Sequence, residues 1–372
     1  MRRRCENEFL QTILEKRWTE IIETIRNDTI VKNYRDQFTK KYPLHFVTSA
    51  YDAPPEILCT IISLLLETQL SITDEQDKNG YTPLALACAF GLDFSCIRIL
   101  LEANQSICKL LTKKGDTLLS LACQTSKTSY ETIMMLLHHC PHSARLKNNM
   151  GWTPLHCAVW NDLSLPSLRA VIQSFPDALY SQTYSSEHTP LSLYWTNHSA
   201  CSLSRDERFT ISLLAGTFEG STNDDVIGSC EVGILHKILS FPQYLPGIVD
   251  SILFSFPHEA RIHDEYGRLP LHRVIENVKF PMCDILRVLS TYPEATGIAD
   301  PVTGDIPLIS AIMCSTRSFK WQGVLQEIFQ TFPEAIYYRN KQNLLPFMVA
   351  AAYSSLDICY NMLRSAPELV YP

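Results

Sequence analysis

The sequence lacks a long run of apolar residues, and its first residues do not resemble a leader that directs secretion. Its most apolar stretch, Ile57–Leu66, contains Thr60 and Ser63 and is too short to cross a bilayer. After Arg4 the chain continues with Cys-Glu-Asn-Glu rather than with the apolar segment of a signal peptide. We therefore expect no insertion into a membrane.

The motifs of common catalytic and nucleotide-binding sites are also missing. The chain has no Gly-x-x-x-x-Gly-Lys-Ser/Thr loop, no Gly-x-Gly-x-x-Gly fingerprint, no Gly-x-Ser-x-Gly elbow and no His-Glu-x-x-His helix. The net charge of −7 argues against general affinity for nucleic acid. These absences predict a protein that is not an enzyme, uses no cofactor or metal, and does not bind nucleic acid.

The thirteen cysteines include no closely spaced pairs of the kind that bind zinc or build a disulfide framework. An odd number without such pairs favours free, buried thiols in a reducing compartment. The cytoplasm is therefore the expected location, and the nucleus is the alternative.

One cluster has the composition of a metal site, namely His138-His139-Cys140-Pro141-His142. Adjacent side chains on a helix diverge, and histidine is favoured near a helix C-terminus by the helix dipole. A structural role is therefore preferred, and a metal- or thiol-dependent protein using this cluster is kept as a remote alternative.

The segment Gly151–Ala158, with the sequence Gly-Trp-Thr-Pro-Leu-His-Cys-Ala, combines a turn with a helix start. Gly151 can adopt a positive φ, Thr153 can cap the helix, and Pro154 suits the first helical position. Imperfect copies recur along the chain. Their key apolar residue falls at positions 44, 84, 119, 155, 191, 235, 271, 308 and 347, with steps of 40, 35, 36, 36, 44, 36, 37 and 39 residues.

A Thr-Pro-Leu-His-x-Ala signature with a period near 33 residues is typical of ankyrin repeats. From about residue 8 to the C-terminus, the chain resembles the ankyrin-repeat family. The resemblance implies an all-α solenoid of about nine to ten antiparallel helix pairs joined by short hairpin-like turns. It also implies that the motif histidines hydrogen-bond to neighbouring turns, rather than that His156 and Cys157 form a catalytic pair. The histidines in register are His45, His156, His236 and His272.

A proline recurs at the point where each outer helix should end. Proline cannot continue a helix, so it marks the end of the outer helix. An alanine often follows within three residues, and we expect it to pack under the next repeat. These alanines are Ala144, Ala178, Ala260, Ala295 and Ala335.

The chain is divided by composition into four parts. Residues 1–41 are predicted to form a capping helix pair and a link, and residues 42–215 a first block of repeats. Residues 216–231 are rich in Gly, Ser, Thr, Asn and Asp and predict a long polar loop, and residues 232–372 form a second block. A continuous stack is preferred over one hinged at this loop.

By the same resemblance, a partner is expected to contact the turn tips and the exposed face of the inner helices, which line a concave groove. The candidates lie just after the turn glycine or late in the inner helix. They are Tyr81, Phe90, Asp116, Trp152, Trp160, Asn161, Arg268, Glu276 and Asp305. Aromatic anchors are enriched at binding hot spots, although Phe90 and Trp160 could instead pack against adjacent helices.

The leading hypothesis is a monomeric, non-catalytic scaffold that binds a protein partner, and the acidic overall balance favours a basic or neutral one. An alternative is that these repeats are the targeting region of a larger regulatory protein, such as a kinase or a ubiquitin-ligase adaptor.

Overall fold

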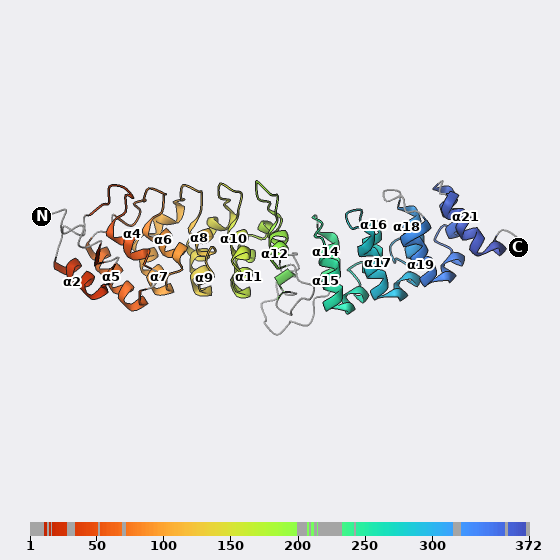
Figure 1. The fold of residues 1–372 in the computed structure, drawn as a ribbon, viewed down its shortest axis with the longest axis horizontal. Helices are drawn as coiled ribbons and strands as arrows, with labels where there is room; N and C mark the ends of the chain where they lie inside the picture. The colour runs from red at the N-terminus through yellow and green to blue at the C-terminus, as the bar shows by residue number, and fades with distance from the viewer. Residues whose placement is uncertain are drawn as a thin grey trace. The chain divides into compact units, whose positions relative to one another are not determined.

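The computed structural model describes the following residues: 11–12, 15, 17–27, 34–50, 53–68, 72–198, 207, 210–211, 214, 233–241, 243–314, 321–353 and 356–369. Within this part of the chain every regular element is a helix and none is a strand, so the predicted all-α class is confirmed (Figure 1). The contacts divide the chain into two compact units, Met1–Asn197 and His198–Pro372. The predicted polar loop, residues 216–231, lies outside the described residues.

The first unit is a stack of paired helices, drawn as an inner and an outer row in Figure 1. The inner helices are α4 (Pro43–Thr48), α6 (Pro83–Phe90), α8 (Leu118–Ala122), α10 (Pro154–Trp160) and α12 (Pro190–His198). The outer helices are α2 (Trp18–Asn27), α5 (Pro55–Thr68), α7 (Phe94–Ala103), α9 (Tyr130–His139) and α11 (Leu165–Ser174). The predicted capping pair is represented by α2, which packs on α5. Most of its predicted partner helix lies outside the described residues.

The second unit repeats the same pairing. Its inner helices are α14 (Ile234–Ser240), α16 (Pro270–Glu276), α18 (Pro307–Met313) and α20 (Pro346–Ala352). Its outer helices are α15 (Ile248–Ser255), α17 (Met282–Thr291), α19 (Gln326–Thr331) and α21 (Leu356–Ser365). A short π-helix, η7 (Trp321–Leu325), leads directly into α19.

Threonine caps start several inner helices, as the motif predicts. The Oγ1 atoms of Thr82 and Thr117 accept from backbone N–H groups three residues ahead, at 3.1 Å in both cases. Thr153 makes the same contact with His156 at 3.4 Å. The capping oxygen satisfies one of the N–H groups that a helix start leaves without a partner.

A 3₁₀-helix follows most outer helices and accounts for the proline–alanine signal. These turns are η2 (Gln105–Lys109), η3 (Pro141–Arg145), η4 (Pro176–Tyr180), η5 (Pro257–Arg261), η6 (Pro293–Gly297), η8 (Pro333–Tyr337) and η9 (Pro367–Leu369). Proline occupies the first position of six of them, where no N–H donor is needed. All five predicted alanines are buried. The 3₁₀-helices η3, η5, η6 and η8, which carry four of them, contact the inner helix of the next repeat, as predicted.

The core follows the apolar residue of the repeated motif. Eight of its nine copies are buried, namely Leu44, Leu84, Leu119, Leu155, Leu191, Leu235, Leu271 and Leu308. The ninth, Phe347, is half-buried. No helix in the described part of the chain is both long and apolar enough to cross a membrane.

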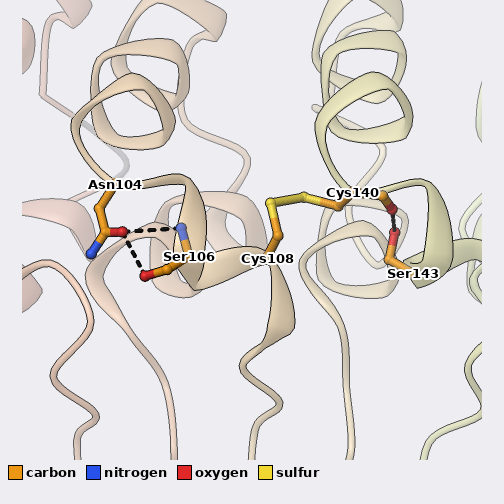
Figure 2. Close-up of a disulfide and its surroundings, with 5 residues drawn as sticks. All are labelled: Asn104, Ser106, Cys108, Cys140 and Ser143. Carbon is orange, nitrogen blue, oxygen red and sulfur yellow. Dashed lines mark hydrogen bonds between the residues drawn. A yellow bond between two sulfur atoms is a disulfide. The ribbon is translucent and has the colours of Figure 1, made fainter.

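The prediction that the thiols are free is wrong at one pair. Cys108 in η2 and Cys140 at the end of α9 form a disulfide, with their Cα atoms 5.4 Å apart (Figure 2). The two residues are 32 positions apart in sequence. Stacking brings neighbouring repeats into contact at these two cysteines. Two cysteines so far apart in sequence do not form a local motif that would predict the disulfide. The other eight cysteines of the described part are free.

Candidate functional site

Four of the described turns before inner helices are built around an Asp or Asn side chain that accepts hydrogen bonds from the turn backbone. The Oδ1 atom of Asp77 accepts from the N–H groups of Asn79 and Tyr81 at 2.8 and 2.9 Å. Asn148 accepts in the same way from the residues two and four positions ahead, both at 3.0 Å. Asp264 and Asn340 repeat this arrangement in the second unit. This role was not predicted, although an Asp or Asn at the start of the turn is its signal in the sequence.

Successive turns of the first unit are joined by backbone hydrogen bonds. Lys113 donates to the Asn79 carbonyl at 3.0 Å, Asn149 to Lys114 at 2.9 Å, and Tyr184 to Met150 at 3.0 Å. We call residues 78–80, 113–115, 149–151 and 184–186 the turn ribbon. The turns extend in one direction from the inner helices in Figure 1. The ribbon therefore holds side chains from four repeats in fixed order.

Close approach within the ribbon requires glycine at residue 151. Gly151 has φ of +82°, and a Cβ atom there would lie 2.6 Å from the Tyr184 backbone nitrogen. Gly247 has a similar φ of +78° but no atom within 4 Å of the same point. Both alanine variants bear the cost of a left-handed backbone, but only Gly151→Ala also creates a clash. We expect Gly151→Ala to lower the free energy of unfolding by about 1–3 kcal/mol more than Gly247→Ala, measured by urea titration. Equal losses of stability in the two variants would show that the turn ribbon can shift to remove the clash.

The motif histidines link each inner helix to the next turn, as expected. The Nε2 atom of His156 lies 3.1 Å from the His188 carbonyl oxygen, and that of His272 lies 3.0 Å from the Ile298 carbonyl. His45 and His236 make equivalent contacts. A carbonyl oxygen only accepts, so Nε2 carries the proton. Burial lowers the pKa of all four rings, to about 4 for His45 and His156.

The comparison with protein-family models agrees with this geometry. Residues 95–177 match the model described as ankyrin repeats in three copies. This part of the chain is formed by ankyrin repeats. No curated protein matches it. Ankyrin repeats are generally protein–protein interaction modules and are typically non-catalytic. The turns and inner helices are therefore the first place to look for a binding surface.

In the stacked turns, two predicted contact residues are not exposed. Asp116 and Asp305 are only 4% and 9% exposed. The Oδ1 atom of Asp116 accepts from Asn148 Nδ2 in the next turn at 2.9 Å. The Asp305 carboxyl is likewise hydrogen-bonded to Asn340 of its following turn, while burial raises its pKa. The expectation of exposed carboxylates is wrong at both positions, because these groups tie consecutive turns together.

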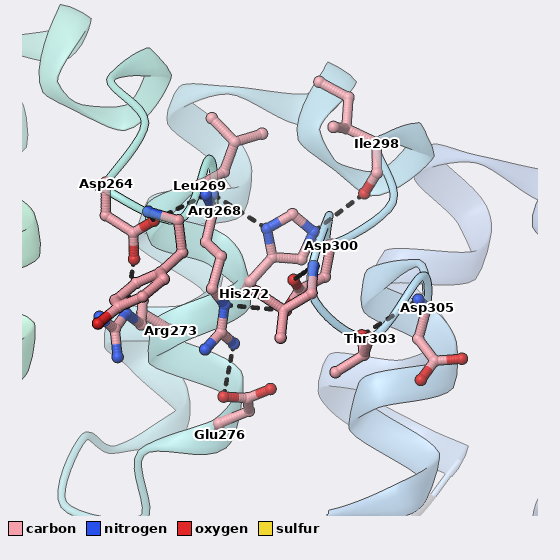
Figure 3. Close-up of polar contacts among 12 residues, drawn as sticks. Asp264, Arg268, Leu269, His272, Arg273, Glu276, Ile298, Asp300, Thr303 and Asp305 are labelled. Carbon is pink, nitrogen blue, oxygen red and sulfur yellow. Dashed lines mark hydrogen bonds and ion pairs between the residues drawn. The ribbon is translucent and has the colours of Figure 1, made fainter. Parts of the chain in front are cut away.

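Arg268 occupies the same position and also reaches into the next turn. Its Nε atom lies 2.8 Å from the buried Asp300 carboxylate, and its Nη2 atom lies 2.6 Å from Glu276 (Figure 3). Nearby, Arg273 Nε pairs with Asp264 at 3.0 Å. The predicted contact residues Arg268 and Glu276 therefore belong to one cluster of charged side chains. Its cations and carboxylates largely neutralise one another, and of the predicted residues Glu276 remains the more exposed.

Asn161 is also used internally. Its Nδ2 atom donates to the carbonyl of Cys157 in its own helix at 2.8 Å and to that of Cys123 in the preceding repeat at 3.3 Å. Asn277 makes the equivalent bond to Leu239 in the second unit at 2.7 Å. The amide thus caps the ends of two neighbouring inner helices. A free side chain for a partner was expected at Asn161, and the structure does not provide one.

Two predicted aromatic residues are accessible, and two are half-buried. Trp160 is 49% exposed and Phe90 is 36% exposed, so neither is fully packed against adjacent helices. The Trp152 ring packs edge-on against Trp160, with centroids 5.8 Å apart, and is only partly exposed. Tyr81 is also half-buried, and burial next to Asp116 raises its pKa. Their role in binding a partner stays a prediction.

The two residues before the turn glycine are exposed, although neither position was among the predicted contact residues. They are Lys78, Asn79, Lys113, Lys114, Asn149, Met150, Glu265 and Tyr266. In the turn ribbon, Met150 and Tyr184 add large apolar surfaces to this exposed row. The signal that could have identified these positions is their place at the corner between the Asp or Asn acceptor and the glycine.

The histidine cluster of the remote metal hypothesis is altered by the disulfide. Cys140 is bonded to Cys108, so its thiolate is not available in this structure. His138 and His139 stand edge-to-face with centroids 5.1 Å apart. Among the described residues, no group of three or more His, Cys, Asp or Glu side chains is placed to hold a metal ion.

Proposed function

We propose that this protein is a non-catalytic scaffold whose first unit binds a protein partner through the turn ribbon and through Phe90 and Trp160. The observation that carries the proposal is the ribbon itself, in which Met150 and Tyr184 are exposed while their backbones are hydrogen-bonded to each other. A surface that is already ordered loses little conformational entropy when it binds. Partly buried aromatic side chains beside polar neighbours are common anchors in such interfaces.

The charge of the turn ribbon indicates the chemistry of the partner. Lys78, Lys113 and Lys114 are exposed, and none forms an ion pair with another described residue. The net charge of the chain favours a basic or neutral partner, but charges beyond about 10 Å are largely screened in physiological salt. Local charge should therefore dominate at the contact. We infer that the partner presents acidic side chains next to apolar ones.

Affinity capture with matched charge-reversal variants tests this proposal. We expect Lys114→Glu to weaken capture of the partner at least tenfold, because it places a carboxylate opposite an acidic surface. The control is Lys109→Glu, which makes the same change at an exposed lysine in η2, outside the turn ribbon. Binding should also weaken as salt is raised. A partner that both variants retain equally would move the site away from the ribbon.

Truncation of the aromatic anchor supplies an independent test. Trp160→Ala should reduce partner affinity by about 2 kcal/mol or more if Trp160 is a hot spot. The control is Tyr360→Ala, which removes an exposed aromatic ring from α21 in the second unit. Isothermal titration with the captured partner measures both affinities, and circular dichroism confirms that both variants are folded. Equal affinities would assign the anchoring role to other residues.

A further inference from the structure

A second pair of cysteines joins the outer helices of two successive repeats in the first unit. Cys59 lies in α5 and Cys96 lies in α7, and these helices pack against each other. Their Sγ atoms are 3.0 Å apart. The Cys96 thiol also lies 3.7 Å from the Pro55 carbonyl oxygen, which places its sulfur against the first turn of α5.

Only a small movement of the two sulfurs separates this contact from a covalent bond. A disulfide has an S–S length of about 2.05 Å, so the two sulfurs need to approach by about 1 Å. A side-chain rotation can supply such a change without unpacking the helices. We propose that Cys59 and Cys96 are an oxidisable pair that forms an inter-repeat disulfide when the protein meets a small-molecule disulfide such as oxidised glutathione.

The two sulfurs differ in accessibility, and this difference determines which of them reacts first. Cys59 is partly exposed and Cys96 is fully buried. Burial raises the pKa of the Cys96 thiol, and the contact with Cys59 raises it further. Cys59 is therefore the sulfur that meets the oxidant, and Cys96 is the one that resolves the intermediate.

The exchange is balanced as two steps. The Cys59 thiol loses its proton and attacks one sulfur of oxidised glutathione, which breaks the glutathione S–S bond, forms a mixed disulfide and releases one glutathione. The Cys96 thiol then loses its proton and attacks Cys59 Sγ, which breaks the mixed disulfide and releases the second glutathione. Two protein thiols are oxidised to one disulfide, and one glutathione disulfide is reduced to two thiols.

The position of the pair shows what its oxidation would change. Cys59–Cys96 joins the outer helices of two neighbouring repeats, and Cys108–Cys140 joins the end of the second of these repeats to the next one. Together they would link three consecutive repeats. Neither pair lies in the turn ribbon. Oxidation is thus expected to resist separation of these repeats while leaving the proposed binding surface in place.

Disulfide mapping of the full chain tests the inference directly. The reduced protein is incubated with oxidised glutathione at pH 8, the remaining thiols are alkylated, and the proteolytic peptides are identified by mass spectrometry. We expect a peptide pair linked through Cys59 and Cys96, which disappears after reduction. The inference is overturned if the Cys108–Cys140 peptide pair is found while Cys59 carries only glutathione or alkylating agent.

Thermal unfolding adds a readout of the cross-link in the folded protein. Oxidation should raise the Tm of the wild type by about 5–10 °C more than that of Cys59→Ser, because closing a loop of this length restricts the unfolded chain. The control is Cys283→Ser, which removes an exposed thiol from α17 in the second unit. It should keep the full wild-type rise. Equal rises for wild type and Cys59→Ser would also overturn the inference.

Discussion

Replacing Leu155 with alanine is expected to lower the free energy of unfolding by about 2–5 kcal/mol, one of the two largest effects that we predict. Leu155 is fully buried on α10, which packs against α8 and α11. Truncation removes apolar contacts and leaves a cavity that rigid neighbouring helices cannot fill. Urea unfolding followed by circular dichroism measures the loss.

A matched change at an exposed leucine separates burial from residue type. Leu146 lies just after η3 and is exposed, so Leu146→Ala should change stability by no more than about 0.5 kcal/mol. A repeat protein can also unfold in parts. Leu155→Ala should then broaden the unfolding transition of the first unit. Similar losses for both variants would contradict the assignment of Leu155 to the core.

Acid is expected to destabilise the fold through its four buried histidines. Burial holds the pKa of His45 and His156 at about 4, below the value of 6.5 that applies to an exposed ring. The pKa values of His236 and His272 are lowered for the same reason. Below pH 6.5 the unfolded chain therefore binds protons that the folded chain does not bind.

The sign of the pH effect follows from this difference in bound protons. The stability that depends on these histidines is greatest above about pH 7 and falls as pH decreases from about 6.5 to about 4, where the folded rings of His45 and His156 also become protonated. For His45 and His156 the difference corresponds to about 3 kcal/mol each. In addition, His156 Nδ1 accepts from the Thr153 N–H at 3.2 Å, and a proton on Nδ1 would remove that hydrogen bond.

Urea titrations at pH 7.0, 5.5 and 4.5 test the effect with His156→Gln. At pH 7 the variant should be less stable than the wild type, because glutamine does not reproduce both ring contacts. The difference should shrink by about 2 kcal/mol at pH 4.5, since only the wild-type ring is penalised by acid. His142→Gln, at an exposed residue of η3, should keep the wild-type slope. An unchanged difference for His156→Gln would assign the acid sensitivity to other groups.

Most of the fold could be predicted because its signals are local or periodic. The motif leucine, the proline that ends an outer helix and the alanine that follows it each act within a few residues of themselves, and each recurs at one point of every repeat. The histidine contacts were predicted for a related reason. Four histidines at equivalent positions must have equivalent neighbours once the repeats stack.

The candidate surface was predicted less well, because exposure in a stack is decided by the following repeat. Asp116 and Asp305 follow a turn glycine, but each is covered by the first residue of the next turn. Trp160 and Phe90 are accessible because their neighbours leave part of each ring uncovered. The charge of this surface could not be predicted from the overall composition either. The exposed lysines of the turn ribbon are positive, whereas the net charge of the chain is negative.

The sequence by itself therefore determined the repeat, the helix pairs, the buried leucines and the histidine links between repeats. Only the tertiary structure decided which turn residues face solvent and which cysteines meet. Asp116 and Asn148 are 32 residues apart, as are Cys108 and Cys140, and Cys59 and Cys96 are 37 apart. Each separation is about one repeat. Such pairs come together only when neighbouring repeats pack, and no pattern within a single repeat encodes which side chains then touch.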